Sequence, residues 1–197
     1  QTSTDGMQMD VYMDDGLLYE NLETDLAGSY QLKNIATAIM ALEALKDADA
    51  VVEEEAVVYG LKNVKSLTGL QGRWQTLQEN PLTICDCGHN PAAFTEINEQ
   101  LTDLDYDQLQ IVMGTVNDKD VEGLLEMAPQ NAIYYFCKPD VPRGMDVEEL
   151  QQIANEMGLY GEVYYSVKEA LAAAQINAGP EDVVLVCGSV FVVAEVV

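Results

Sequence analysis

The sequence predicts an α/β fold built around a mostly parallel sheet, and two observations support this. From Arg73 onward, short apolar runs typical of strands recur: "RWQTLQ", "LTICDC", "LQIVMG", "AIYYFC", "EVYYS" and "DVVLVCG". Amphipathic, helix-like patterns separate most of these runs and cover Pro91 to Leu104, Asp118 to Ala128, Asp146 to Met157 and Val167 to Asn177. Strands that alternate with helices in this rhythm form parallel sheets with both faces covered.

The first 70 residues follow a different pattern. Met7 to Met13 and Leu17 to Glu23 predict two strands, and Asp14-Asp15-Gly16 between them is typical of a hairpin turn. We expect two helices next. The first, "YQLKNIATAIMALEALK", is capped by Ser29 and has an apolar stripe, whereas the second, "EEEAVVYGLKN", begins with glutamates that suit its positive end. The stripe consists of Ile35, Ala38, Ile39, Leu42 and Leu45.

A domain boundary is expected near Gly69 to Gly72. The stretch "VKSLTGLQG" loses periodicity and carries two glycines, which is typical of a connection between folded units. We therefore divide the chain into residues 1–70 and 71–197. Its 197 residues exceed the usual size of one domain, which fits either one large domain or a domain and part of another.

The charge balance excludes some classes of partner. The 34 acidic and 9 basic residues give a net charge of −25, so a phosphate backbone would be repelled and no nucleic-acid binding is expected. No run of about 18 apolar residues would span a membrane, and the first residues do not resemble a signal peptide, so we expect a cytoplasmic protein without membrane contact. A polyanion such as ATP could bind only through local cations and helix amino termini. The chain has only two arginines, Arg73 and Arg143.

The stretch "ICDCGHNPAAF" contains the only histidine, His89, and two of the four cysteines. A strand is expected to end near Cys87, after which Asn90 caps a helix with Pro91 in its first turn. Asp86 and His89 would then lie at the carboxyl end of a strand, where sheets of this kind bind ligands. The other loops at this edge are "GTVNDKD", "KPDVPRG" and "GSV".

Three interpretations of this stretch remain open from the residues alone. Cys85, Cys87 and His89 could hold a metal, although zinc sites generally need a fourth ligand and a wider first pair. The cysteines could instead be core residues beside a loop-packing histidine, since isolated buried thiols are expected in a cytosolic chain. A nucleotide-binding turn is the third possibility.

Six fragments in order favour the third interpretation. "GSYQLKNIATAIMAL", "QGRWQ", "DCGHNP", "NDKD", "PRG" and "CGSVFVVAEV", between Gly28 and Val196, resemble folylpolyglutamate synthase and dihydrofolate synthase of the Mur ligase group. The resemblance implies a Rossmann-like Mur ligase carboxyl-terminal domain over residues 71–197, preceded by the end of a central ATPase domain over residues 1–70. The sequence lacks the P-loop pattern Gly-x-x-x-x-Gly-Lys-Ser/Thr, so we expect a fragment that is inactive alone.

The resemblance also implies an activity. Members of the group use ATP and Mg²⁺ to activate a carboxylate as an acyl phosphate, which the amino group of an amino acid then attacks. The expected partners are ATP, folate or dihydropteroate, and L-glutamate, with the metal ligands mainly in the missing amino-terminal part. Two alternatives stay open: another Mur-type amide ligase, or a non-catalytic domain that binds a nucleotide or a metal.

Seven residues take roles by resemblance. The roles are nucleotide binding for Asn34, Arg73 and Asp86, catalysis for His89 and Lys119, and substrate binding for Arg143 and Ser189. Tyr30 departs from the family because a histidine usually precedes the glutamine there. The last segment, "SVFVVAEVV", is β-branched enough to favour a strand, but the resemblance implies a helix.

Overall fold

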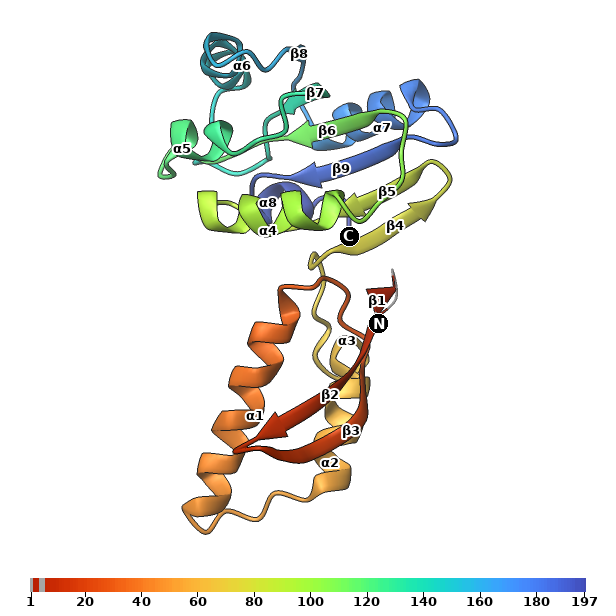
Figure 1. Cartoon of the computed structure of the whole chain (residues 1–197). Coiled ribbons are helices and arrows are strands. Elements are labelled where there is room, and N and C mark those ends of the chain that lie inside the picture. The colour runs from red at the N-terminus through yellow and green to blue at the C-terminus, as the bar shows by residue number, and fades with distance from the viewer. Residues whose placement is uncertain (1, 4–5) are drawn as a thin grey trace. The chain divides into compact units, whose positions relative to one another are not determined.

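The computed structural model describes residues 2–3 and 6–197, and the chain divides into two compact units. Unit 1 covers Gln1–Arg73 and unit 2 covers Trp74–Val197. The division follows Arg73, close to the predicted boundary at residues 70 and 71. Figure 1 shows the elements of both units.

Unit 1 contains a small antiparallel sheet of β1 (Thr2–Ser3), β2 (Gly6–Met13) and β3 (Gly16–Thr24). The predicted hairpin is confirmed, with Met13 paired to Gly16 across the turn. The turn residues Asp14 and Asp15 have φ of 47° and 66°, the left-handed conformations that a two-residue hairpin loop requires and that aspartate tolerates. Strand β1 is too short to give a pattern in the sequence and was not predicted.

Three helices follow: α1 (Gln31–Asp47), α2 (Glu54–Lys62) and α3 (Val64–Thr68). Both predicted helices exist, but Tyr30, not Ser29, occupies the N-cap position of α1. The predicted stripe is too wide, since Ile35 and Ile39 are buried while Ala38 and Leu45 are exposed. Helix α3 was read as irregular because five residues are too few to show a period. The core of unit 1 consists of Met7, Tyr19, Leu22, Ile35, Ile39 and Val57.

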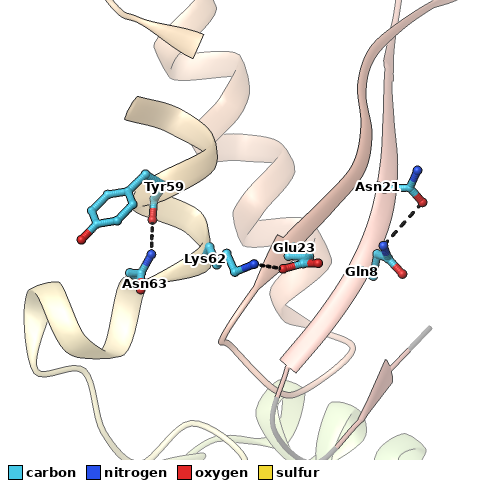
Figure 2. A network of polar contacts seen from close by, with 6 residues as sticks. All are labelled: Gln8, Asn21, Glu23, Tyr59, Lys62 and Asn63. Atoms are coloured by element: carbon cyan, nitrogen blue, oxygen red, sulfur yellow. Dashed lines mark hydrogen bonds and ion pairs between the residues drawn. The ribbon is translucent and has the colours of Figure 1, made fainter. Parts of the chain in front are cut away.

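Polar contacts support this small core, as Figure 2 shows. Lys62 of α2 forms an ion pair with Glu23 of β3. Asn21 accepts a hydrogen bond of 3.5 Å from Gln8 across the hairpin, and Asn63 donates to the Tyr59 carbonyl at 2.8 Å at the end of α2. Exposed contacts of this kind contribute little each, so burial of the apolar residues carries most of the stability of unit 1.

Unit 2 is built on a six-stranded sheet in the order β4-β5-β9-β6-β7-β8. Only β4 runs antiparallel to its neighbour, so the predicted mostly parallel α/β fold is confirmed. Each of the six predicted apolar runs corresponds to a strand in the structure. Their bounds are β4 (Gln75–Glu79), β5 (Leu82–Cys85), β6 (Leu109–Met113), β7 (Ala132–Cys137), β8 (Gly161–Tyr164) and β9 (Val183–Cys187).

Helices cover both faces of the sheet. Helix α7 (Val167–Asn177) packs along β6, β7, β8 and β9, and α4 (Pro91–Leu101) lies on the opposite face (Figure 1). Helices α5 (Val121–Glu126) and α6 (Val147–Glu156) are shorter than their predicted patterns. The last segment contains a helix, α8 (Val190–Val193), as the family resemblance implied and against its strand propensity.

The four cysteines are buried in the core of unit 2. Cys85, Cys87 and Cys137 pack with valines of β6 and β9, alanines of α7, and Val192 and Val193 of α8. Cys187 is also fully buried, and none of the four cysteines forms a disulfide. Among the described residues, no helix combines the length and the apolar character needed to cross a bilayer.

Candidate functional site

The carboxyl ends of β5, β9 and β6 lie next to one another in the centre of the sheet, and each continues into a glycine-containing loop. Gly188, after β9, donates a backbone hydrogen bond of 3.1 Å to the Gly88 carbonyl after β5. Gly188 has a φ of 98°, and a Cβ there would lie 2.6 Å from the Gly114 carbonyl oxygen. Only glycine fits this position without strain, so the three loops form one closely packed backbone edge.

Asp86 follows β5 directly and is buried, with only 4% of its surface exposed. One carboxylate oxygen accepts a hydrogen bond of 2.8 Å from the Trp74 backbone N–H, and the other accepts one of 2.8 Å from Gly88. Trp74 has a φ of 45°, an uncommon conformation for a large side chain that this bond helps to hold. Asp86 thus fixes both the start of β4 and the loop after β5, whatever it does for a ligand.

His89 and Asn90 lie in the same loop. His89 Nδ1 is 3.0 Å from the Cys87 carbonyl oxygen. Because a carbonyl can only accept, Nδ1 carries a proton, and Nε2 of a neutral ring is left as an acceptor. Asn90 accepts a hydrogen bond of 2.9 Å from the Ala93 N–H and is the predicted cap of α4, with Pro91 in the first turn.

The metal interpretation finds no support in this geometry. The part of the chain that the structure describes contains no group of three or more His, Cys, Asp or Glu side chains placed to hold an ion. Burial raises the pKa of the Cys85 thiol to about 12, and burial also raises the pKa of Cys187 well above its ordinary value. A thiolate is the form that binds zinc, so these neutral core thiols are poor ligands.

The loops after β6 and β7 are joined along their backbones. Asn117 donates to the Arg143 carbonyl at 3.0 Å, Met145 donates to the Thr115 carbonyl at 3.0 Å, and Val116 forms a bridge with Gly144. Arg143 Nη1 lies 2.9 Å from Asp118 Oδ2. The Arg143 guanidinium carbon also lies 4.6 Å from the centre of the Phe191 ring, which belongs to α8.

Lys119 and Ser189 lie at the same edge of the sheet. Lys119 is exposed in the loop after β6. The predicted helical pattern begins at Asp118, but the N-cap of α5 is Asp120, which accepts a hydrogen bond of 3.0 Å from the Gly123 N–H. Ser189 is 3% exposed and caps α8, where its Oγ accepts from the Phe191 N–H at 3.2 Å.

The remaining two predicted site residues belong to unit 1. Asn34 is exposed on α1 and donates a hydrogen bond of 2.8 Å to Gln31 Oε1, so the two amides act as a pair. Arg73 is the last residue of unit 1, and its Nη1 donates to the Gly72 carbonyl at 3.0 Å. The structure therefore groups Asp86, His89 and Ser189 on adjacent loops, and Lys119 with Arg143 on the next two.

Two residues at this edge were missed from the sequence. The Thr115 hydroxyl is fully buried and is one of the few buried side-chain oxygens in the described residues that lack a hydrogen-bond partner. Phe191 stacks under Arg143. The position of Thr115, directly after Gly114 at a strand end, was available as a signal, but the contact of Phe191 joins segments far apart in the chain.

The fold and this edge define a class of protein: an α/β domain whose central parallel strands end in glycine-containing loops at one edge of the sheet. Residues 72–190 match the family model "Mur ligase, glutamate ligase domain", and the chain belongs to that family.

Known relatives are folate ligases. The dihydrofolate synthase/folylpolyglutamate synthase of Escherichia coli is 34% identical over 166 residues, covering 83% of this chain and 36% of the relative. A probable bifunctional folylpolyglutamate synthase/dihydropteroate synthase of Haloferax volcanii is 36% identical over 172 residues, covering 86% of this chain and 20% of the relative. The chain therefore spans well under half the length of these relatives.

A solved structure shows the same architecture. Escherichia coli FolC in complex with DHPP and ADP superimposes with a TM-score of 0.76 at 32% identity, covering 94% of this chain and 42% of that one. A bifunctional folylpolyglutamate synthase/dihydrofolate synthase with Mn, AMPPNP and L-glutamate bound gives a TM-score of 0.69 at 30% identity, covering 82% of this chain and 38% of that one.

Proposed function

We propose that this chain supplies the carboxyl-terminal part of an ATP-dependent ligase that adds L-glutamate to a folate-type acid, either folate or dihydropteroate. One observation carries the proposal: relatives named for this activity match more than four fifths of the chain, and the match includes both units. The backbone edge described above is compatible with the chemistry, because phosphoryl transfer needs positioning and charge neutralisation more than a protein nucleophile.

We propose a nucleotide-binding role for each of Asn34 and Arg73 in unit 1 and for Asp86 in unit 2. Arginine suits phosphate because its planar fork donates two parallel hydrogen bonds. Asp86 accepts two backbone N–H groups, and a carboxylate is the kind of acceptor that a ribose hydroxyl would need. Asn34 would bind adenine through an amide that Gln31 orients.

The proposed reaction side consists of His89, Lys119, Arg143 and Ser189. When bound, ATP supplies the phosphoryl group that activates the acid. Lys119 would neutralise an anionic phosphate or carboxylate. His89, when its ring is neutral, would accept a hydrogen bond at Nε2, because Nδ1 is directed at the Cys87 carbonyl. We propose Mg²⁺ as the metal, held mainly by the part of the enzyme outside this chain, since the described residues provide no ligand cluster of their own.

The test is an assay of the complete gene product for phosphate release, with L-glutamate and each of three acids: dihydropteroate, tetrahydrofolate and a peptidoglycan precursor. Glutamate-dependent release with a pterin acid is expected. Release with the peptidoglycan precursor alone would show that the chain serves a different ligase. The isolated 197-residue chain should show no turnover, because its sequence contains no phosphate-binding P-loop.

A lysine pair tests the site within the active enzyme. Lys119→Ala should lower kcat/KM by about tenfold or more, the effect of losing roughly 1.4 kcal/mol of interaction with an anion. Lys168→Ala removes the same charge from an exposed position on α7, outside the loops after β5, β6, β7 and β9, and should leave activity unchanged. Equal losses in the two variants would mean that net charge, and not the loop, determines the effect.

A further inference from the structure

Arg143 joins three segments that meet at the carboxyl edge of the sheet. Its guanidinium forms an ion pair of 2.9 Å with Asp118 from the loop after β6, and it stacks over Phe191 of α8. One guanidinium nitrogen therefore contacts a carboxylate, and the guanidinium carbon lies over an aromatic ring. Both are contacts within the protein that a substrate would have to compete with or share.

The backbone holds the two charged residues opposite one another. Hydrogen bonds on either side of Arg143, from Asn117 to its carbonyl and from Met145 to Thr115, join the two loops as a short antiparallel pair. Gly144 allows the tight turn within the loop after β7, because a Cβ there would lie 2.5 Å from the Pro139 carbonyl oxygen of the same loop. The backbones thus hold the two loops together, and the half-exposed side chains of Arg143 and Asp118 meet across them.

The carboxylate that Arg143 contacts is one residue from Lys119. In a chain with a net charge of −25, a lysine that serves an anion has many competing carboxylates, and Asp118 is its immediate neighbour in sequence. Without Arg143, the Asp118 carboxylate would repel an incoming anion and attract the Lys119 ammonium. Both effects would weaken anion binding at this loop.

We infer that Arg143, to which the resemblance assigns substrate binding, is instead a positioning residue that neutralises Asp118 and so leaves Lys119 available to an anionic substrate, without touching the substrate itself. The inference rests on the proposed function only in assuming that an anion binds at Lys119. Arginine suits the task better than lysine, because a planar guanidinium can pair with Asp118 and stack on Phe191 at the same time.

A double-mutant cycle in the complete enzyme tests this inference. The KM values for ATP and for glutamate are measured first in Lys119→Ala, and the substrate whose KM rises is the one to follow. Arg143→Ala should raise that KM about tenfold with a smaller change in kcat, and Asp118→Asn should change it by less than twofold. The double variant Asp118→Asn/Arg143→Ala should return to within about threefold of the wild type.

Three outcomes would overturn the inference. If the double variant binds as poorly as Arg143→Ala, then Arg143 contacts the substrate directly. If Arg143→Ala leaves KM unchanged, Asp118 does not interfere with binding. If Lys119→Ala changes neither KM, no anionic substrate binds at Lys119, and Arg143 cannot act by keeping that lysine available. Arg143→Lys is a graded control and should fall between Arg143→Ala and the wild type, since it keeps the charge but loses the planar stack.

A second measurement separates this inference from the proposed function. Pyrophosphate is titrated into the 197-residue chain while the Lys119 amide resonance is followed by NMR, for the same four members of the cycle. Weaker binding in Arg143→Ala that is restored in the double variant supports the inference even if the complete enzyme ligates no glutamate. Equal pyrophosphate affinity in all four would overturn it even if glutamate ligation is found. Trp74 fluorescence checks that each variant is folded.

Discussion

At the scale of single residues, burial determines the pKa values of the cysteine thiols. Cys85 is fully buried, and desolvation, helped by the nearby Cys87 and Asp86, raises the pKa of its thiol from 9.0 to about 12. The Cys137 and Cys187 thiols shift in the same direction, again chiefly through burial. These groups stay neutral at physiological pH, so they pack as small apolar side chains and are poor nucleophiles.

An alkaline loss of stability follows from the Cys85 shift. In the unfolded chain this thiol ionises near pH 9, below its folded pKa of about 12, so its contribution to stability is complete below pH 9 and is lost as pH rises toward 12. We expect the urea midpoint to fall between pH 8.5 and 10, and to fall less steeply in Cys85→Ala. Urea titrations at half-unit pH steps check this, and parallel pH curves for the two proteins would contradict it.

At the scale of elements, the tight loop after β9 is the most sensitive point of the sheet edge. Gly188→Ala would combine a left-handed φ of 98° with a Cβ only 2.6 Å from a backbone carbonyl. We expect it to lower the free energy of unfolding by about 2 kcal/mol or more, because backbone atoms cannot move aside as a flexible side chain can. Urea unfolding of the chain measures this loss.

Gly60→Ala is the matched control for that substitution. Gly60 lies inside α2, and a Cβ there meets nothing within 4 Å. The same change should therefore stabilise the chain by up to about 1 kcal/mol, through helix propensity alone. Comparable destabilisation in both variants would show that the close approach at Gly188 is not what makes the position sensitive.

The elements also show what a sequence can and cannot predict. Short apolar runs separated by amphipathic segments predicted the strands of unit 2, because strands that pack in a covered sheet are rich in apolar residues. Helix α8 would have been read as a strand from Val190 to Val193, and its helical form depends on the Ser189 cap and on packing of Val192 and Val193 into the core. Tertiary packing overrides propensity in such a short segment.

The candidate site also contains some features that could be predicted from the sequence and others that could not. The loop of Asp86 and His89 could be placed from topology, because strands of a parallel sheet bring their carboxyl ends to one edge. The pairing of Arg143 with Asp118 could not, because the two residues are 25 positions apart and no periodic pattern links them. The hydrogen bonds that Asp86 accepts from the Trp74 and Gly88 N–H groups could not be predicted from the sequence either.

At the scale of the whole molecule, charge is the dominant feature. A net charge of −25 on 197 residues means strong repulsion among surface carboxylates, which disfavours the compact state. Salt screens such repulsion over a distance of about 10 Å at 0.1 M and about 3 Å at 1 M. The folded state should therefore gain more from added salt than a protein of balanced charge.

We expect the urea midpoint of the chain to rise steadily between 0.05 and 1 M NaCl. Sucrose at matched osmolality is the control, since it favours compact states without screening charge. A midpoint that stays flat or falls with NaCl, or that rises equally with sucrose, would mean that the acidic surface does not limit stability.

The bond between Asp86 and Trp74 has a practical consequence for anyone who recombines domains of these ligases. The Trp74 N–H is held by a carboxylate twelve residues later, inside the sheet. A chimera joined before Arg73 keeps Trp74, whereas one joined at Gln75 that supplies proline at position 74 loses the donor, and one that supplies a residue disfavouring a φ of 45° strains the loop. Such a hybrid would fold poorly and could be mistaken for an enzyme that has lost its nucleotide.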